Sequence, residues 1–429
     1  MSILRKIYPL VLLLIFIIIC VIRSHENNVK TKNIIFSDQE GYYMYLPALF
    51  IYGGFDQYPI RTKEQFGYYQ NTKKVFTKYT CGVALLQMPF FLIAHAFCKF
   101  SGAPADGFSP IYMSLLDFST ILYIALAFIF LFLTLKNQFQ KPVLLIAFFC
   151  FFFGSNLYYY TVIDGLMSHA YSFFLIATLL YFTPRFYDNP NYRNCVFLGL
   201  LIGFIILCRP SNIIVLLYFI LYNVSNRKSM IERMLFYRKN APKVIVSALC
   251  TFLVFVPQFI YWFHLSGNFI LYSYENEGFI YWKSPKIGKV LFGVWNGWIL
   301  YTPMILFALI GLYAAIKHKV KNAISTLIIF LIATYLFGSW WAWWFGGAYG
   351  HRCYIDLYPL LIPFFCIFLQ KISELSVRKK ILIGGLFLLI VFHNLRMIDL
   401  YTKTKPWDGA AFTVNTYLLL QKRIFFPFL

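Results

Sequence analysis

The chain has 429 residues, of which 60% are hydrophobic and only 13% charged, and its mean hydropathy is +0.67. Soluble domains carry about a quarter charged residues, so this composition excludes a water-soluble protein. The formal net charge is +22, but the lysines and arginines gather in short gaps between apolar runs. That distribution is typical of the cytoplasmic loops of membrane proteins, and we expect no nucleic-acid partner.

The first apolar run, residues 7–22, predicts a membrane helix. It follows Arg5 and Lys6, and no small-residue cleavage site comes after it. We therefore expect an uncleaved first helix, residues 1–22, with the N-terminus in the cytoplasm. Residues 23–110 then form a long outer loop. Its apolar stretch 82–98 is interrupted by polar residues and proline, and is expected to lie on the outer surface as a juxtamembrane helix.

Further apolar runs are long enough to span a bilayer, which takes about 20 residues: 111–135, 142–158, 167–183, 243–263, 298–316, 322–340, 354–370 and 380–396. The stretch 195–222 is broken at Arg209-Pro210, because proline cannot continue a helical hydrogen-bond ladder. Two short helices, 195–208 and 211–222, place every basic gap in the cytoplasm. A single kinked helix is the alternative.

These runs predict an all-α polytopic membrane protein with about eleven transmembrane helices. The membrane domain, residues 111–396, carries the outer loops 264–297 and 341–353, and a short outer tail covers 397–429. On this topology the inner loops are short and basic, whereas the outer loops are long, aromatic and acidic. We therefore expect the functional site on the outer side.

Two carboxylates, Asp38 and Glu40, open the first outer loop just before an aromatic stretch that contains Tyr43. A carboxylate near the low-dielectric interface can have a raised pKa and serve as a general base. The same pair could hold a divalent cation such as Mg²⁺ or Mn²⁺. Two solvated loop acids are the plain alternative.

Two arginines are candidate ligands of a phosphate, because a guanidinium group binds phosphate oxygens in a bidentate way. Arg352 follows His351 after a segment rich in tryptophan and glycine, and Arg209 lies in the helix break. An ionisable residue inside a membrane segment is a functional hypothesis by default. The alternatives are an interfacial anchor for Arg352 and a structural ion pair with an acid such as Asp164 for Arg209.

Aromatic and polar residues of the outer loops are candidates for binding a sugar or an acceptor. His169 starts a helix, where it could donate to a phosphate or carry a proton. An ordinary interfacial role is the alternative for each of them. The candidates are Tyr43, Asp164, His169, Glu275, Trp295 and Trp344.

Several short motifs resemble those of the GT-C glycosyltransferases, above all the branch of protein O-mannosyltransferases and aminoarabinose transferases of lipid A. This sequence departs from the family pattern where Gln39 separates the two acids and where Thr80-Cys81 replaces a proline pair. It also has no large outer C-terminal domain. The motifs are Asp38-Gln39-Glu40 before Tyr43, Lys78-Tyr79-Thr80-Cys81-Gly82 with the later Pro89, Ser168-His169-Ala170, and Trp343-Trp344-Phe345-Gly346-Gly347 leading to Gly350-His351-Arg352.

The resemblance implies an enzyme that transfers a sugar, with inversion, from a polyprenyl-phosphate carrier to a glycan, lipid or protein. Asp38 would be the base, with Glu40 as its alternate. Arg352, His351 and Arg209 would hold the lipid phosphate. The bias toward Lys, Ile, Phe and Asn suggests a bacterium with an AT-rich genome. We then expect the inner membrane, with the site and the C-terminus in the periplasm. A transporter or flippase of lipid-linked sugars and a non-catalytic scaffold are the competing interpretations.

Overall fold

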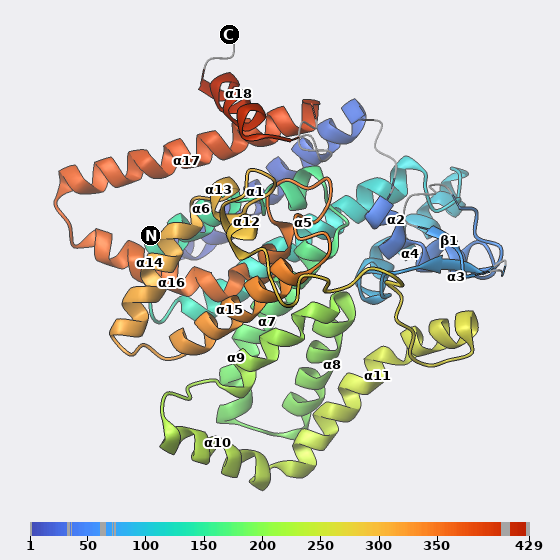
Figure 1. The fold of residues 1–429 in the computed structure, drawn as a ribbon, viewed down its shortest axis with the longest axis horizontal. Coiled ribbons are helices and arrows are strands. Elements are labelled where there is room, and N and C mark those ends of the chain that lie inside the picture. Colours follow the sequence, from blue (N-terminus) through green and yellow to red (C-terminus); the bar gives the residue numbers. More distant parts are fainter. Residues whose placement is uncertain are drawn as a thin grey trace.

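The computed structural model describes residues 2–31, 35, 37–60, 66–70, 72, 74–404 and 412–425 (Figure 1). Five of the described helical segments are long and apolar enough to cross a membrane: α4 (Gly82–Ser101), α5 (Pro110–Leu135), α11 (Ala241–Ser266), Arg352–Ser373 and Val377–Lys403. The fourth joins the short 3-10 helix η3 (Arg352–Leu357) to α16 (Tyr358–Ser373), and the fifth belongs to α17 (Val377–Thr404). The predicted helical, polytopic membrane protein is confirmed.

Other helices lie on the remaining apolar runs. They are α1 (Ser2–Thr31), α6 (Lys141–Phe153), α7 (Ser168–Asp188), α8 (Tyr192–Cys208), α14 (Ile305–Lys317) and α15 (Ala323–Ser339). A π-helical turn, η1 (Tyr159–Ile163), joins α6 to α7. The number of these helices that cross the bilayer stays a prediction.

The chain breaks where the sequence predicted. Helix α8 ends at Cys208, and Pro210 starts a 3-10 helix, η2 (Pro210–Val215), that leads into α9 (Leu216–Ile220). Proline is tolerated there because the first turn of a helix has no internal partner for its missing N–H group. Arg209, the residue between the two helices, has an extended backbone. Its side chain is therefore not aligned with the side chains of either helix.

Close helix packing holds the membrane domain together. A Cβ atom on Gly199 of α8 would lie 2.2 Å from the carbonyl oxygen of Ser247 on α11, so only glycine permits this approach. Ser247 in turn donates a hydrogen bond to the carbonyl oxygen of Cys195, at 2.8 Å. Small residues and interhelical hydrogen bonds of this kind are the usual means of association between membrane helices.

The described residues between 37 and 77, which belong to the predicted first outer loop, fold into a small layer at one side of the molecule (Figure 1). We call this layer the outer layer after its predicted position. It contains α2 (Ser37–Tyr43), α3 (Tyr45–Phe50) and an antiparallel hairpin of β1 (Phe66–Tyr68) and β2 (Val75–Thr77), which the sequence did not predict. Helix α4 follows and packs against α5. Because α4 is also long and apolar enough to cross the bilayer, its placement on the outer surface stays a prediction.

The remaining elements are short or peripheral. Helices α12 (Ile287–Phe292) and α13 (Trp298–Tyr301) form part of the loop before α14, and the basic helix α10 (Arg227–Lys239) has no buried residue. In the expected C-terminal tail, α17 continues to Thr404 and α18 (Val414–Phe425) follows. Residues 405–411 and 426–429 of that tail lie outside the described part of the chain.

Candidate active site

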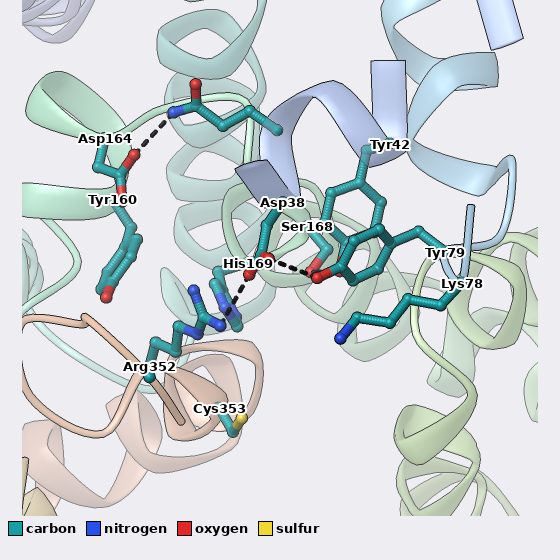
Figure 2. A network of polar contacts seen from close by, with 12 residues as sticks. Asp38, Tyr42, Lys78, Tyr79, Tyr160, Asp164, Ser168, His169, Arg352 and Cys353 are labelled. Carbon is teal, nitrogen blue, oxygen red and sulfur yellow. Dashed lines mark hydrogen bonds and ion pairs between the residues drawn. The ribbon is translucent and has the colours of Figure 1, made fainter. Parts of the chain in front are cut away.

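An ion pair joins two segments that lie 314 residues apart in the sequence. Nη2 of Arg352, at the start of η3, donates to Oδ2 of Asp38 on α2 at 2.8 Å. The hydroxyl of Tyr79 donates to the other carboxylate oxygen, so Asp38 lies between the two groups (Figure 2). The Arg352 and Asp38 side chains are 18% and 14% exposed. The pair is therefore largely enclosed but keeps some contact with solvent.

The surroundings of Asp38 keep its carboxylate ionised. Burial acts to raise the pKa of this group, but Arg352, the Tyr79 hydroxyl and Lys78 together bring the pKa below its ordinary value of 3.8. The opposite charge and the hydrogen bond both favour the charged form. At neutral pH Asp38 is thus an anion, and its partners make it a weaker base than a free carboxylate.

A second ion pair lies beside the first and is more deeply buried. Nε of Arg209 is 3.2 Å from Oδ2 of Asp356, which is only 1% exposed. The same oxygen accepts a bond from Nδ2 of Asn212 at 3.0 Å, and Oδ1 is 2.8 Å from Nδ1 of His169. The carboxylate of Asp356 therefore has partners on both oxygens, whereas the Arg209 side chain keeps 15% of its surface exposed.

Both guanidinium groups lie near Tyr42 of α2. The Tyr42 hydroxyl donates to Oγ of Ser168 at 3.1 Å, and Ser168 also accepts from Nη1 of Arg209 at 3.5 Å. Burial raises the pKa of Tyr42 to about 12, although Arg209 and Arg352 are both close enough to oppose the shift. The two ion pairs thus form one site next to α2, in which each arginine is balanced by an acid.

Residues 78–82 contact both Asp38 and the end of α8, which precedes Arg209. Tyr79 contacts Asp38, and the next residue, Thr80, donates to the carbonyl oxygen of Leu207 near the end of α8. A Cβ atom on Gly82 would lie 2.5 Å from the backbone nitrogen of Cys208. Close contact between α4 and the last turn of α8 therefore fixes the backbone that carries Arg209.

A third cation lies at the edge of the site. Nζ of Lys78 is 2.8 Å from Oε1 of Glu277, and it also lies over the rings of Tyr274 and Tyr79. This pair ties the first outer loop to the loop 264–297. The two side chains are 20% and 28% exposed, so solvent screening keeps their contribution to stability small.

The two acids of the predicted pair have different surroundings. Glu40 is fully buried and accepts a hydrogen bond from the Tyr58 hydroxyl at 2.9 Å. Neighbours separated by two positions on a helix do not share a face, so α2 directs only Asp38 toward Arg352. Tyr43 is also fully buried, and its hydroxyl donates to the carbonyl oxygen of Gly107 at 2.6 Å. Both residues are part of the packing of the outer layer.

The acid that pairs with Arg209 is Asp356, and not Asp164. Asp164 is half-buried and accepts a bond from Nε2 of Gln39 at 2.7 Å (Figure 2). His351 is buried, and its Nε2 donates to the carbonyl oxygen of Trp343 at 3.1 Å. Burial lowers the pKa of His351 to about 3, so this imidazole is neutral at physiological pH and orders the chain before Arg352.

Two of the predicted aromatic residues, Trp295 and Trp344, stack on each other. The rings of Trp295 and Trp344 are stacked at 4.4 Å, and Nδ2 of Asn296 donates to the carbonyl oxygen of Trp344 at 3.0 Å. Glu275 is exposed and has a positive φ of 49°. No hydrogen bond or ion pair joins its side chain to another described residue.

Within the described ranges, no three His, Cys, Asp or Glu side chains gather as a metal site would require. Both oxygens of Asp38 already have partners, and Glu40 faces another direction. This donor set does not fit a divalent cation, and no chemical step is assigned to one.

Three buried residues of the site have no role in the predictions from sequence: Asp356, Asn212 and Tyr79. One signal was present, because Asp356 follows Arg352 by four positions and a helical turn brings such residues to one side. Nothing in the sequence shows that α7 and the break after α8 meet this turn.

No family model and no curated protein sequence matches the chain. Among solved structures, it is similar to the crystal structure of the Archaeoglobus fulgidus oligosaccharyltransferase in complex with zinc and sulfate, with a TM-score of 0.43 and 14% sequence identity. The match covers 95% of this chain and 53% of that one, so the chain spans about half the length of its neighbour. Similarity at this level assigns neither family nor activity.

Proposed function

We propose that the protein is a membrane glycosyltransferase of the GT-C type. It moves a sugar from a polyprenyl-phosphate carrier to a glycan, lipid or protein acceptor at the outer, periplasmic face of a bacterial inner membrane. The observation that carries the proposal is the contact between Asp38 and Arg352. It places a candidate base directly against a candidate phosphate ligand, in a chain whose apolar helices suit a lipid carrier.

Arg209 can bind the phosphate first. Its Nε is neutralised by Asp356, but among the described residues its terminal nitrogens contact only weak acceptors: the Cys353 thiol at 3.1 Å, the Ser168 hydroxyl at 3.5 Å and the His169 ring. A phosphate oxygen is a much stronger acceptor for a guanidinium group than a thiol or a hydroxyl. The phosphate therefore gains a charge-assisted bond without displacing a carboxylate.

Arg352 then links donor binding to the activation of Asp38. A phosphate bound at Arg209 competes with Asp38 for the Arg352 guanidinium group. Once that group turns to the phosphate, the strongest influence that lowers the Asp38 pKa is lost, and burial raises it again. Asp38 becomes a better base only after the donor is in place.

The transfer itself needs no group beyond these. The acceptor hydroxyl oxygen attacks the anomeric carbon of the sugar, its proton passes to Asp38, and the bond between that carbon and the phosphate oxygen breaks. The phosphate leaves with the bonding electron pair, and Arg209 and Arg352 stabilise its added charge. Attack opposite the leaving phosphate inverts the anomeric configuration.

Mass spectrometry of the lipids that co-purify with the protein in mild detergent tests the proposal. Wild type and Glu374→Gln, a change at an exposed residue outside the candidate site, are expected to retain a polyprenyl-phosphate sugar. Arg352→Ala is expected to retain much less of it, because one of the two phosphate ligands is gone. Finding only ordinary phospholipid in all three preparations would remove the main support for a lipid-linked donor. A retained donor that is moved across vesicle membranes without transfer to an acceptor would indicate a flippase instead.

A further inference from the structure

The carboxylate of Asp356 is enclosed by donors from two other elements. His169 belongs to α7, and Arg209 and Asn212 belong to the break after α8. Asp356 itself lies on η3 with Arg352 and is fully buried. Its carboxylate is therefore the point at which these three parts of the chain meet.

The contacts of Asp356 determine how its neighbours are oriented. A carboxylate only accepts hydrogen bonds, so Nδ1 of His169 carries the proton that it shares with Oδ1 of Asp356, and in the neutral ring Nε2 has none. Nη1 of Arg209 is 3.2 Å from both ring nitrogens of His169. An in-plane position at equal distances would overlap the ring carbon between them, so Nη1 lies over the face of the ring.

Arg209 is therefore held on two sides. Asp356 holds Nε, and the ring of His169 contacts Nη1. The terminal nitrogens are left with the weak acceptors Cys353 and Ser168. A cation that is already oriented loses little conformational entropy when it binds an anion. The carboxylate also balances the charge of Arg209 in the free protein, which makes the buried position tolerable.

We propose that Asp356 is a positioning residue: through Arg209 and His169 it preforms the binding site for the carrier phosphate, without touching the substrate. This inference rests on the proposed function, because it assigns Arg209 to the phosphate. It separates the two arginines by role. Arg209 is the permanent phosphate ligand, and Arg352 is the ligand released from Asp38.

The test measures binding of farnesyl phosphate, a short isoprenyl phosphate, to the purified full-length protein, with farnesol as the uncharged counterpart. Asp356→Asn is expected to weaken farnesyl phosphate binding about tenfold or more, as loss of an outer partner does for metal ligands. Farnesol binding should stay within about twofold, because the apolar contacts remain. A general loss of packing would weaken both probes alike.

A double-mutant cycle asks whether Asp356 acts through Arg209. Arg209→Ala should weaken farnesyl phosphate binding, and adding Asp356→Asn should then cost little more. Asp356→Glu keeps the charge but displaces it, and should bind with an affinity between those of wild type and Asp356→Asn. If Asp356→Asn fails to fold, Asp356→Glu alone must still show the selective loss of the phosphate probe.

The outcomes separate the two proposals. Equal binding by wild type and Asp356→Asn, additive losses in the cycle, or wild-type affinity in Asp356→Glu would overturn the positioning role and leave glycosyl transfer standing. A wild-type protein that binds farnesyl phosphate no better than farnesol would overturn the phosphate site, and with it both proposals.

Discussion

The two arginines of the site differ in what holds them. Arg352 pairs with Asp38, a residue of the outer layer whose side chain is 14% exposed. Arg209 pairs with Asp356, which is 1% exposed and bonded on both oxygens. Asp38 thus keeps some contact with solvent, whereas the carboxylate of Asp356 is enclosed by its donors.

This difference indicates that the two ion pairs have different roles. Breaking a buried pair leaves an uncompensated charge and is costly, and Asp356 is the more deeply buried of the two acids. A site that must hold an anion and also activate a base needs both kinds of pair. The Arg209–Asp356 pair suits holding the anion, and the Arg352–Asp38 pair suits activating the base.

The largest expected effect comes from Asp38→Asn. The amide keeps the shape of the side chain but cannot accept the acceptor's proton, so turnover should fall by about 10²–10⁴-fold, the usual contribution of a general base. Binding of the donor should persist, because Arg352 becomes more available. Transfer from a synthetic lipid-linked sugar, followed by chromatography, measures turnover. Activity near the wild-type level in this variant would exclude Asp38 as the base.

Gly82→Ala tests the close contact between α4 and the end of α8, which positions Arg209. The added Cβ would lie 2.5 Å from the backbone nitrogen of Cys208, so α4 or the end of α8 must shift, at a cost of about 1–3 kcal/mol. We expect a lower thermal midpoint together with weaker binding of farnesyl phosphate. Gly384→Ala on α17 is the control, since nothing lies within 4 Å of that position. Equal effects of the two substitutions would contradict the close contact.

Tyr58→Phe tests whether Glu40 belongs to the scaffold of the outer layer. The change removes the hydroxyl that donates to Glu40 at 2.9 Å, and should lower the free energy of unfolding by about 1–3 kcal/mol. The folded protein should retain its turnover, because Glu40 does not face Arg352. Tyr68→Phe, at a tyrosine that is 56% exposed, is the matched control. A large loss of turnover at unchanged stability would instead indicate that Glu40 is a candidate base.

Acid should weaken the Asp38 pair selectively. Because Arg352 and Tyr79 lower the pKa of Asp38 below 3.8 in the folded protein, the carboxylate contributes stability that is fully present above pH 3.8. This contribution is lost as the pH falls through the lowered pKa. Thermal midpoints of wild type and Asp38→Asn in detergent should therefore differ at neutral pH and converge in strong acid. A difference that does not change with pH would argue against the ion pair.

The smallest effect is expected for Glu275→Gln. Glu275 is exposed, and surface substitutions of this kind usually change stability by less than about 0.5 kcal/mol. Transfer and lipid retention should match those of wild type. A clear loss of acceptor binding, measured with the donor saturating, would show that the loop 264–297 takes part in acceptor recognition.

The sequence by itself determined the membrane class, the positions of most helices and the break at Arg209-Pro210. These features depend on local properties: an apolar run must leave water, and proline cannot donate within a helix. It also indicated Asp38, Arg209 and Arg352 as unusual, because charged residues are rare beside or within apolar segments.

Only the tertiary structure decided which of these residues meet. Asp38 and Arg352 lie 314 residues apart, and Asp356 reaches His169 across 187 residues. Such contacts follow from the packing of α2, η3, α7 and the end of α8, which no local pattern encodes. Packing also separated Asp38 from Glu40, because the turn of α2 directs one acid to the cations and the other into the outer layer.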